Sequence, residues 1–457
     1  MSGSSFPPVF AGRRFSVLGL GRNGLPAALA LAAMGAEVSA WDDDPAACAA
    51  ARLVRLADPL AIPPDTDALI LSPGIPHSFP RPHPAAARAA ALGIPILSDA
   101  ELLFRAVRAA GSRARFIGIT GTNGKSTTTA LIAHILKAAG VPHAAGGNLG
   151  PAALALPLLP DRGHYVLEMS SYMLERIDEL RFDIAILLNL SPDHLDRHGS
   201  MEGYIAAKRQ IFAHRAADGL AIIGIDDQPS REIAGSLAPP IICISGDRPA
   251  DVWCESGGLC DRGGLILAMH EAQALPGTHN AQNAAAATAT ALALGIARPT
   301  IGAAIRSFAG LPHRQQRICE AGGIAFINDS KATNADSAAC ALACYDRVVW
   351  IAGGIGKEGG IEPLAPFFPR VAEALLIGRD APLFAATLAR HNVPHRILSH
   401  LDEAVPAALA SAQAHSSPII LLSPAAASFD QFKGFPERGE RFALLARGLC
   451  AQTGRAA

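Results

Sequence analysis

The sequence predicts an α/β protein of three domains, each a mainly parallel sheet flanked by helices. Length is the first observation behind this prediction, because 457 residues are enough for about three domains of ordinary size. The second is an alternation of short β-branched runs with alanine-rich stretches of helical length, which is typical of parallel sheets with helical connections. The third is composition: 50% of the residues are hydrophobic and 17% are charged, so each domain can bury a core.

The three domains are predicted at residues 1–111, 112–310 and 311–457. Their boundaries fall in a stretch typical of a linker at 110–113 and in a glycine–leucine–proline turn at 310–312. The strands predicted in chain order are 14–18, 36–41, 68–72, 115–119, 165–167, 184–188, 325–328, 348–352, 374–377 and 419–422. The helices predicted with them are 25–35, one that begins at Asp99, 280–295 and 301–308.

Charge and cysteine content argue against several classes of protein. Lysine and arginine number 39 against 40 aspartate and glutamate, so the chain lacks the positive field that holds a nucleic acid. The 8 cysteines form no Cys-x-x-Cys pair, which argues against a zinc or redox site and suits a reducing compartment. The sequence shows neither a signal-peptide pattern nor a run of about 20 strongly apolar residues. We expect a cytoplasmic protein that neither inserts into membranes nor binds nucleic acid.

A glycine turn between the first strand and the first helix is the first candidate site. Gly19, Gly21 and Gly24 have the spacing that lets backbone N–H groups approach a diphosphate at a helix N-terminus. Asp42 follows the next strand, where a carboxylate can bind a ribose hydroxyl. These residues leave three interpretations open: a nicotinamide cofactor, another nucleotide diphosphate, or a turn without a ligand.

A second glycine-rich turn is far more specific. Residues 117–127 read IGITGTNGKST and connect a predicted strand to a predicted helix. Backbone N–H groups of such a loop bind phosphate, Lys125 can reach the β- and γ-phosphates, and the Ser126 hydroxyl can ligate Mg²⁺. Ile119 replaces the first glycine of the usual G-x-x-x-x-G-K-S pattern, so the loop is a shortened variant. The motif predicts an ATP site.

Side chains that can ligate a metal follow two strands of the same predicted domain. Glu168 ends the strand predicted at 165–167, and His194 lies just after the strand predicted at 184–188. Ligands of parallel sheets gather outside the carboxyl ends of the strands, so both side chains are expected near the phosphate loop. Lys208 lies on a predicted helix, and the sequence alone does not distinguish it from an ordinary helix lysine.

Polar residues also gather on both sides of the second domain boundary. Asn280 and Asn283 lie at a helix start, where Asn280 can serve as an N-cap without any other role. Arg314 suits a phosphate or a carboxylate, because a guanidinium binds either with two hydrogen bonds. A second-substrate pocket is predicted where the first strand of the third domain ends, with the candidates Asp329, Lys331 and Thr333.

The order of these motifs resembles that of the Mur ligase family of peptidoglycan synthesis over nearly the whole chain. The shared stretches are, in family order, GTNGKST, EMSS, NLSPDHLDRH, HNAQN and LPHR. NDSKATN and the downstream LSPAAASFDQF are similar to the branch that adds D-glutamate, whereas sister branches carry a histidine-containing motif in place of DSKATN. The resemblance implies Rossmann-like first and third domains and a central domain like that of P-loop ATPases.

The resemblance also implies the reaction and its cofactors. It implies an ATP-dependent ligase that phosphorylates the alanyl carboxylate of UDP-N-acetylmuramoyl-L-alanine and transfers the acyl group to D-glutamate. It further implies a monomer, two Mg²⁺ ions and a lysine, Lys208, that is carbamylated by CO₂. The residues implied in catalysis are Lys125, His194 and Lys208. The residues implied as metal ligands are Ser126, Glu168, His194 and the carbamylated Lys208.

The binding sites implied by the resemblance cover all three predicted domains. ATP is expected at Gly121, Thr122, Asn123, Gly124, Lys125, Ser126, Thr127, Asn283, Arg314 and Asp329. The UDP substrate is expected at Gly19, Arg22, Asn23, Gly24, Asp42, Ser72, Gly74, Asn148 and Ser170. D-Glutamate is expected at Lys331, Thr333, Lys357, Ser428 and Phe435. Two positions depart from the family pattern, which commonly has glutamine and an acidic residue there: Met173 and Ile355.

Three alternatives compete with this interpretation. A folylpolyglutamate synthase uses the same loop and an acyl phosphate, but it does not need the first glycine turn. A nicotinamide-dependent dehydrogenase would use that turn, but it leaves the phosphate loop unexplained. A non-catalytic nucleotide-binding protein would not need to retain Lys125, Glu168, His194 and Lys208.

Overall fold

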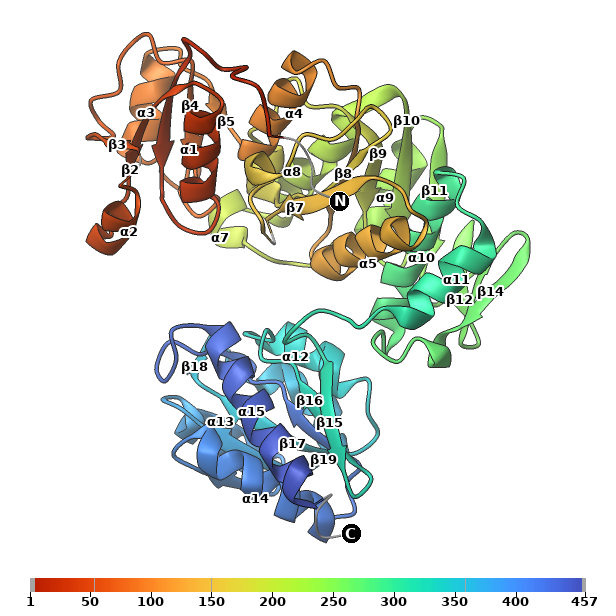
Figure 1. Ribbon diagram of the computed structural model, residues 1–457. Coiled ribbons are helices and arrows are strands. Elements are labelled where there is room, and N and C mark those ends of the chain that lie inside the picture. Colours follow the sequence, from red (N-terminus) through yellow and green to blue (C-terminus); the bar gives the residue numbers. More distant parts are fainter. Residues whose placement is uncertain (1–4, 53, 149, 358, 454–457) are drawn as a thin grey trace. The chain divides into compact units, whose positions relative to one another are not determined.

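The computed structural model describes residues 5–52, 54–148, 150–357 and 359–453, and the chain divides into two compact units (Figure 1). The first unit comprises Met1–Ala272 and Asn280–Phe308, and the second comprises Gln273–His279 and Ala309–Ala457. In the described ranges, no helix is both long and apolar enough to cross a membrane.

The first sheet of the first unit is parallel and has the strand order β3-β2-β1-β4-β5. Side chains alternate between its faces: Val17 shares a core with Leu31 of α1, whereas Leu18 and Leu69 share another with Ala86 of α3. The elements are β1 (Arg14–Leu18), α1 (Gly24–Ala33), β2 (Glu37–Trp41), α2 (Pro45–Ala50), β3 (Arg55–Leu56), β4 (Ala68–Leu71), α3 (Pro84–Ala91) and β5 (Ile96–Leu97).

The second sheet of the first unit has the order β14-β13-β12-β11-β10-β9-β6-β8-β7. Strands β6 to β12 pair in parallel, and β13 and β14 extend the edge as an antiparallel hairpin. Its strands are β6 (Arg115–Thr120), β7 (His143–Gly147), β8 (His164–Glu168), β9 (Phe182–Leu187), β10 (Arg215–Gly224), β11 (Ile241–Ser245), β12 (Val252–Glu255), β13 (Gly258–Asp261) and β14 (Gly264–Ala268). Its helices are α4 (Asp99–Ala109), α5 (Lys125–Ala138), η1 (Ala153–Ala155), α6 (Ser171–Leu174), α7 (Leu195–His198), α8 (Met201–Ala213), α9 (Gln228–Ser236), η2 (Met269–Glu271), α10 (Thr278–Ala293) and α11 (Arg298–Ser307).

Helix α4 is anchored to the segment that leads into β9. The carboxylate of Glu101 is fully buried and accepts backbone N–H groups from residues 178–180, while Arg105 pairs with it at 2.7 Å. The stretch predicted as a linker is anchored as well, because the Ser112 hydroxyl donates to the Leu159 carbonyl oxygen at 2.7 Å. The domain boundaries expected after residues 111 and 310 remain predictions.

The sheet of the second unit has the order β15-β16-β21-β17-β19-β20 and is parallel except for β15. Helices α14 and α15 share one core with the sheet, and α12, η3 and α13 share the other. The elements are β15 (Gln316–Ala321), β16 (Ile324–Asn328), α12 (Ala335–Leu342), β17 (Val348–Gly353), β18 (Ile355–Gly356), η3 (Glu362–Arg370), β19 (Val371–Ile377), α13 (Ala381–Arg390), β20 (His395–Ile397), α14 (Leu401–Ala414), β21 (Ile419–Leu422), β22 (Ala426–Ala427) and α15 (Phe435–Thr453).

The predicted fold class is confirmed, since all three large sheets are mainly parallel and carry helices. The exceptions lie at sheet edges, where β13, β14 and β15 run antiparallel. A hairpin needs only a short turn, whereas a parallel strand needs a crossover, so an added edge hairpin leaves the alternating pattern intact.

Candidate active site

The phosphate loop forms the tight turn that its glycines predict. It joins β6 to α5, and Gly124, just before α5, has a φ of 84°. A Cβ atom there would lie 2.1 Å from Asn283 Oδ1, so only glycine fits. Lys125 Nζ donates to the carbonyl oxygens of Gly121 at 2.8 Å and Thr122 at 2.7 Å. The ammonium group is therefore folded over the turn that is predicted to bind phosphates.

The segment after β9 holds this turn in place. The backbone N–H groups of Thr122 and Asn123 donate to the carbonyl oxygen and Oδ1 of Asn189, both at 2.9 Å. The hydroxyl groups of Thr122 and Tyr204 lie 3.1 Å apart. On the other side, Thr128 donates to Asn283 Oδ1 at 3.1 Å, which brings the predicted nucleotide residue on α10 to the loop.

A buried carboxylate lies beside the first turn of α5. Glu168 ends β8 and is 2% exposed. Its Oε2 accepts the Ser126 hydroxyl at 2.8 Å, and its Oε1 accepts Asn148 Nδ2 at 3.1 Å. Mg²⁺ prefers oxygen ligands and completes its shell with phosphate oxygens and water, so Ser126 and Glu168 fit this ion. Among the described residues, no three His, Cys, Asp or Glu side chains converge, so an all-protein cage is absent there.

Lys208 is buried next to the same loop, with 2% of its surface exposed. Its Nζ donates to the Gly121 carbonyl oxygen at 2.8 Å and to Thr120 Oγ1 at 3.3 Å. Burial, and then the positive charge of Lys125, lower the pKa of Lys208 well below its ordinary value. The amine of this lysine is therefore held in an environment that disfavours its charged form.

His194 lies at the N-cap of α7 with a φ of 52°. Its ring centre is 5.3 Å from that of Tyr172. Burial lowers the pKa of His194, and the nearby Asp193 carboxylate opposes this effect. A neutral imidazole is the form that can ligate a metal.

The first-sheet residues predicted for the UDP substrate lie at the carboxyl ends of its strands, whereas Asn148 and Ser170 follow strands of the second sheet. Asp42 Oδ2 accepts the N–H of Leu20 at 2.6 Å, and the Ser72 hydroxyl donates to the carbonyl oxygen of Gly19 at 2.8 Å. These two contacts hold the glycine turn. Asn23 Nδ2 lies 3.5 Å from the carbonyl oxygen of Gly147, just before the predicted substrate residue Asn148. Ser170 caps α6, since its hydroxyl accepts the Met173 N–H at 3.2 Å.

In the second unit, the predicted nucleotide residue Asp329 is buried and Arg314 is half-buried. Asp329 follows β16 and accepts the Ser423 hydroxyl at 2.8 Å and the Gln315 N–H at 3.2 Å. Burial raises the pKa of Asp329 to about 7. Arg314 lies in the same stretch as Gln315, between the second domain boundary and β15.

Two of the residues predicted for D-glutamate, Lys331 and Phe435, contact each other in the second unit. Lys331 Nζ lies 4.1 Å from the centre of the Phe435 ring, which is a cation–π distance. Ser428 is buried, Thr333 is half-buried, and Lys357 is exposed in the turn after β18. Residue 358, next to Lys357, lies outside the described residues.

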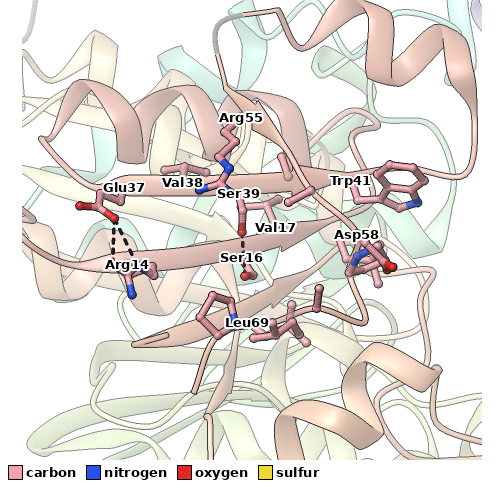
Figure 2. Close-up of a pocket in the computed structure, with 17 residues that line it drawn as sticks. Arg14, Ser16, Val17, Glu37, Val38, Ser39, Trp41, Arg55, Asp58 and Leu69 are labelled. Atoms are coloured by element: carbon pink, nitrogen blue, oxygen red, sulfur yellow. Dashed lines mark hydrogen bonds and ion pairs between the residues drawn. The ribbon is translucent and has the colours of Figure 1, made fainter. Parts of the chain in front are cut away.

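A separate cavity of about 610 Å³ lies against the first sheet (Figure 2). Its polar wall includes the Ser16 and Ser39 hydroxyls, 2.9 Å apart, and the paired side chains of Arg14 and Glu37. None of the residues predicted for the UDP substrate lines it. The cavity is therefore distinct from the candidate site at the strand ends.

Comparison with known proteins decides the family. The chain is 48% identical to a UDP-N-acetylmuramoylalanine–D-glutamate ligase of Paramagnetospirillum magneticum, over 97% of this chain and 98% of that protein. It is 46% identical to the protein of that name from Caulobacter vibrioides, over 98% of each chain. The chain belongs to the UDP-N-acetylmuramoylalanine–D-glutamate ligase family.

A family model and two solved structures give further matches, to the middle domain and to the fold. Residues 119–291 match the Mur ligase middle domain. A UDP-N-acetylmuramate–alanine ligase structure from Thermotoga maritima superposes with a TM-score of 0.62 at 18% identity, covering 95% of this chain and 99% of that one. The structure of MurF from Acinetobacter baumannii gives a TM-score of 0.59 at 20% identity, covering 86% of this chain and 93% of that one. At such low identity these structures show the shared fold alone.

Reasoning from the residues alone missed the burial of Lys208 and the contacts that Asn189 and Arg438 make near the predicted sites. The burial of Lys208 had a signal, because Tyr204, Lys208, Ile211 and Phe212 lie on one helical stripe of α8. No comparable pattern marked Asn189, whose contacts to the loop come from a neighbouring strand end. In the second unit, Arg438 is 1% exposed and donates to Ser330 and Ala426, which supports the segment that carries Asp329.

The raised pKa of Asp329 predicts a stability that falls as pH rises. In the unfolded chain this carboxyl titrates near 3.8, and in the fold it titrates at about 7. The folded state therefore holds an extra proton between these pH values, and stability is lost as pH rises through them. The loss amounts to about 4 kcal/mol at most for this shift. Unfolding in urea from pH 4 to 8, followed through Trp350 in a W41F/W253F background, measures it.

Trp350 reports on the right unit, because its indole N–H donates to the Ser423 carbonyl oxygen at 2.7 Å and Ser423 in turn donates to Asp329. The same titration of Asp329→Asn is the control, since that variant lacks the group. Equal pH dependence in the two proteins would contradict the assignment.

Proposed function

We propose that this protein is an ATP-dependent ligase that joins D-glutamate to the alanyl carboxylate of UDP-N-acetylmuramoyl-L-alanine in peptidoglycan precursor synthesis. The observation that carries the proposal is the near full-length identity to ligases of this name. The phosphate loop beside the buried Ser126–Glu168 pair supports it, because nucleotide chemistry needs both parts.

The first step is proposed to be phosphoryl transfer. A carboxylate cannot form an amide directly at neutral pH, because its oxygen is too poor a leaving group. Attack of the alanyl carboxylate oxygen on the γ-phosphorus of ATP breaks the bond to ADP and forms an acyl phosphate. Lys125, which is folded over the loop, is proposed to neutralise charge on the transferred group. Asn283, Arg314 and Asp329 are proposed to bind the nucleotide.

The second step is proposed to be amide formation. The amine of D-glutamate attacks the activated carbonyl carbon, and the tetrahedral intermediate expels phosphate. Lys331, Thr333, Lys357, Ser428 and Phe435 are proposed to bind D-glutamate. Lys357 is cationic and exposed, which suits a carboxylate of this substrate.

Two Mg²⁺ ions are proposed at the phosphate loop. Ser126 and Glu168 would hold one, and His194 with a carbamylated Lys208 would hold the other. Bound Mg²⁺ would supply neutralisation of the phosphate charge. Carbamylation is supported by the burial of Lys208 and its contact with Gly121, since a neutral amine is the form that reacts with CO₂. We also propose that the protein works as a cytoplasmic monomer.

The decisive experiment is ATP-dependent phosphate release with UDP-N-acetylmuramoyl-L-alanine and a panel of amines. D-Glutamate, L-glutamate, L-lysine and meso-diaminopimelate are assayed in parallel. We expect release with D-glutamate alone. Release with another amine would support an acyl-phosphate ligase but contradict D-glutamate as its amino-acid substrate. No release with any amine would reject the proposed reaction.

A further inference from the structure

Arg197 contacts two parts of the first unit that the proposed reaction uses. It lies on α7, three residues after His194. Its Nη1 donates to the carbonyl oxygen of Gly74 at 2.8 Å. Gly74 ends residues 72–74, the substrate loop, which is predicted to bind the UDP substrate. One guanidinium thus connects this loop to the turn that carries a predicted metal ligand.

The guanidinium of Arg197 also contacts an aromatic ring, that of Tyr172. The Arg197 Cζ atom lies 4.7 Å from the centre of the Tyr172 ring, within cation–π distance. The Tyr172 ring centre is 5.3 Å from that of His194 and 5.4 Å from that of His198, which is stacked on it at 9°. Tyr172 therefore contacts the N-cap residue of α7, His194, and its last residue, His198.

His198 fixes the far end of the same short helix. Its Nε2 lies 2.9 Å from the Ser171 hydroxyl, and its ring centre lies 5.5 Å from that of Tyr204. Tyr204 in turn reaches the phosphate loop through Thr122. Helix α7 has only four residues, so these contacts, rather than its own backbone bonds, determine its position.

A neighbouring arginine, Arg176, offers a comparison within the same unit. Arg176 is 3% exposed, and its Nε and Nη1 donate to the carbonyl oxygens of Tyr172 and Leu71, both at 2.8 Å. Arg197 differs, because its Nε is buried and has no hydrogen-bond partner. A buried donor without a partner is costly in a folded protein, and it is expected where a ligand completes the site.

We infer that Arg197 is a positioning residue that couples the substrate loop to His194. By holding Gly74 and Tyr172 together, it sets the distance between the bound UDP substrate and the turn that carries the metal ligand. Removing the guanidinium therefore loosens both at once, so binding of the UDP substrate and of Mg²⁺ is expected to weaken together. This inference rests on the proposed function, because its readouts are steady-state constants of that reaction.

The test compares Arg197→Met with Arg197→Lys and with Arg215→Met. Methionine keeps the length of the side chain but removes the donor and the charge, whereas lysine keeps both in part. Arg215, the first residue of β10, is the matched control. Like Arg197 it donates to backbone carbonyl oxygens, in this case those of Pro240 and Ala238. For each variant we measure kcat, the KM values of all substrates, the Mg²⁺ concentration for half-maximal rate, and Tm.

Arg197→Met is expected to raise the KM of the UDP substrate and the half-saturating Mg²⁺ concentration by about tenfold each, the range for losing a hydrogen bond to a charged group. The KM of ATP is expected to stay unchanged, and Arg197→Lys to recover most of the loss. The half-saturating Mg²⁺ concentration is also measured for Tyr172→Leu and for the double variant Tyr172→Leu/Arg197→Met. The increase in the double variant is expected to be smaller than the product of the two single increases, because the residues act through one contact.

A lower Tm with unchanged substrate and Mg²⁺ constants would show a structural role only and overturn the inference. The same effects in Arg215→Met would also overturn it. Failure of the proposed function is recognised separately, because the unmodified protein would then release no phosphate with any amine.

Discussion

Lys125→Met is expected to lower kcat for ATP-dependent phosphate release by about 10³-fold or more, with little change in stability. The reason is electrostatic: a cation aimed at the transferred phosphoryl group acts mainly in the transition state, where charge is spread over the γ-phosphate oxygens. The Lys125 ammonium group contacts the carbonyl oxygens of Gly121 and Thr122 and is only partly buried, so methionine can occupy its place without a cavity.

Lys137→Met is the matched control, because Lys137 lies in the last turn of the same helix, α5. It is expected to keep the full rate. Single-turnover measurements separate the chemical step from product release, and thermal unfolding of both variants checks the fold. A Lys125→Met protein that retains the unmodified rate would reject the assignment of this loop as the ATP site.

Lys208→Ala is expected to lower the rate by about 10²-fold or more, even though Lys208 lies on a helix beside the phosphate loop rather than in it. Its side chain is buried against Gly121 and Thr120, so truncation removes the proposed carbamate and leaves a space next to the loop. If the side chain supplies a carboxylate-like ligand, small carboxylic acids that enter this space restore part of the rate.

Acetate and formate are therefore added to Lys208→Ala, with Lys137→Ala as the control for general salt effects. Partial recovery in Lys208→Ala alone, together with a mass increase of one CO₂ on intact unmodified protein, is the expected pattern. Unchanged activity of Lys208→Ala would reject a role in metal binding. A loss of rate that no acid relieves, with no CO₂ adduct, would reject the carbamate.

The fold class was predictable because it depends on local sequence patterns. The alternation of apolar strands with alanine-rich helices specifies mainly parallel sheets, and the strands predicted at 14–18 and 419–422 agree with the observed β1 and β21. The antiparallel pieces were not foreseen, because β13 and β14 are four and five residues long and leave little periodicity. Glycine signals were reliable where backbone geometry requires them, as at Gly124 with its positive φ.

The candidate site was predictable only where chemistry and local structure coincide. The phosphate loop is one continuous segment, so the roles predicted for Lys125 and Ser126 come from the motif itself. The strand-end rule placed Glu168 correctly beside the loop, where it accepts the Ser126 hydroxyl. The same rule says nothing about Lys208, because this residue lies in the middle of a helix. Its lowered pKa results from burial.

The sequence by itself determined the fold class, the phosphate loop and, through resemblance, the reaction. These depend on periodicity and on short contiguous motifs, which need no long-range packing to be recognised. Only the tertiary structure decided which polar groups are desolvated and which meet: Lys208 against Gly121, Asp329 under Ser423, and Arg197 between Gly74 and Tyr172. Burial and electrostatic coupling are properties of residues brought together from distant segments, so no single segment encodes them.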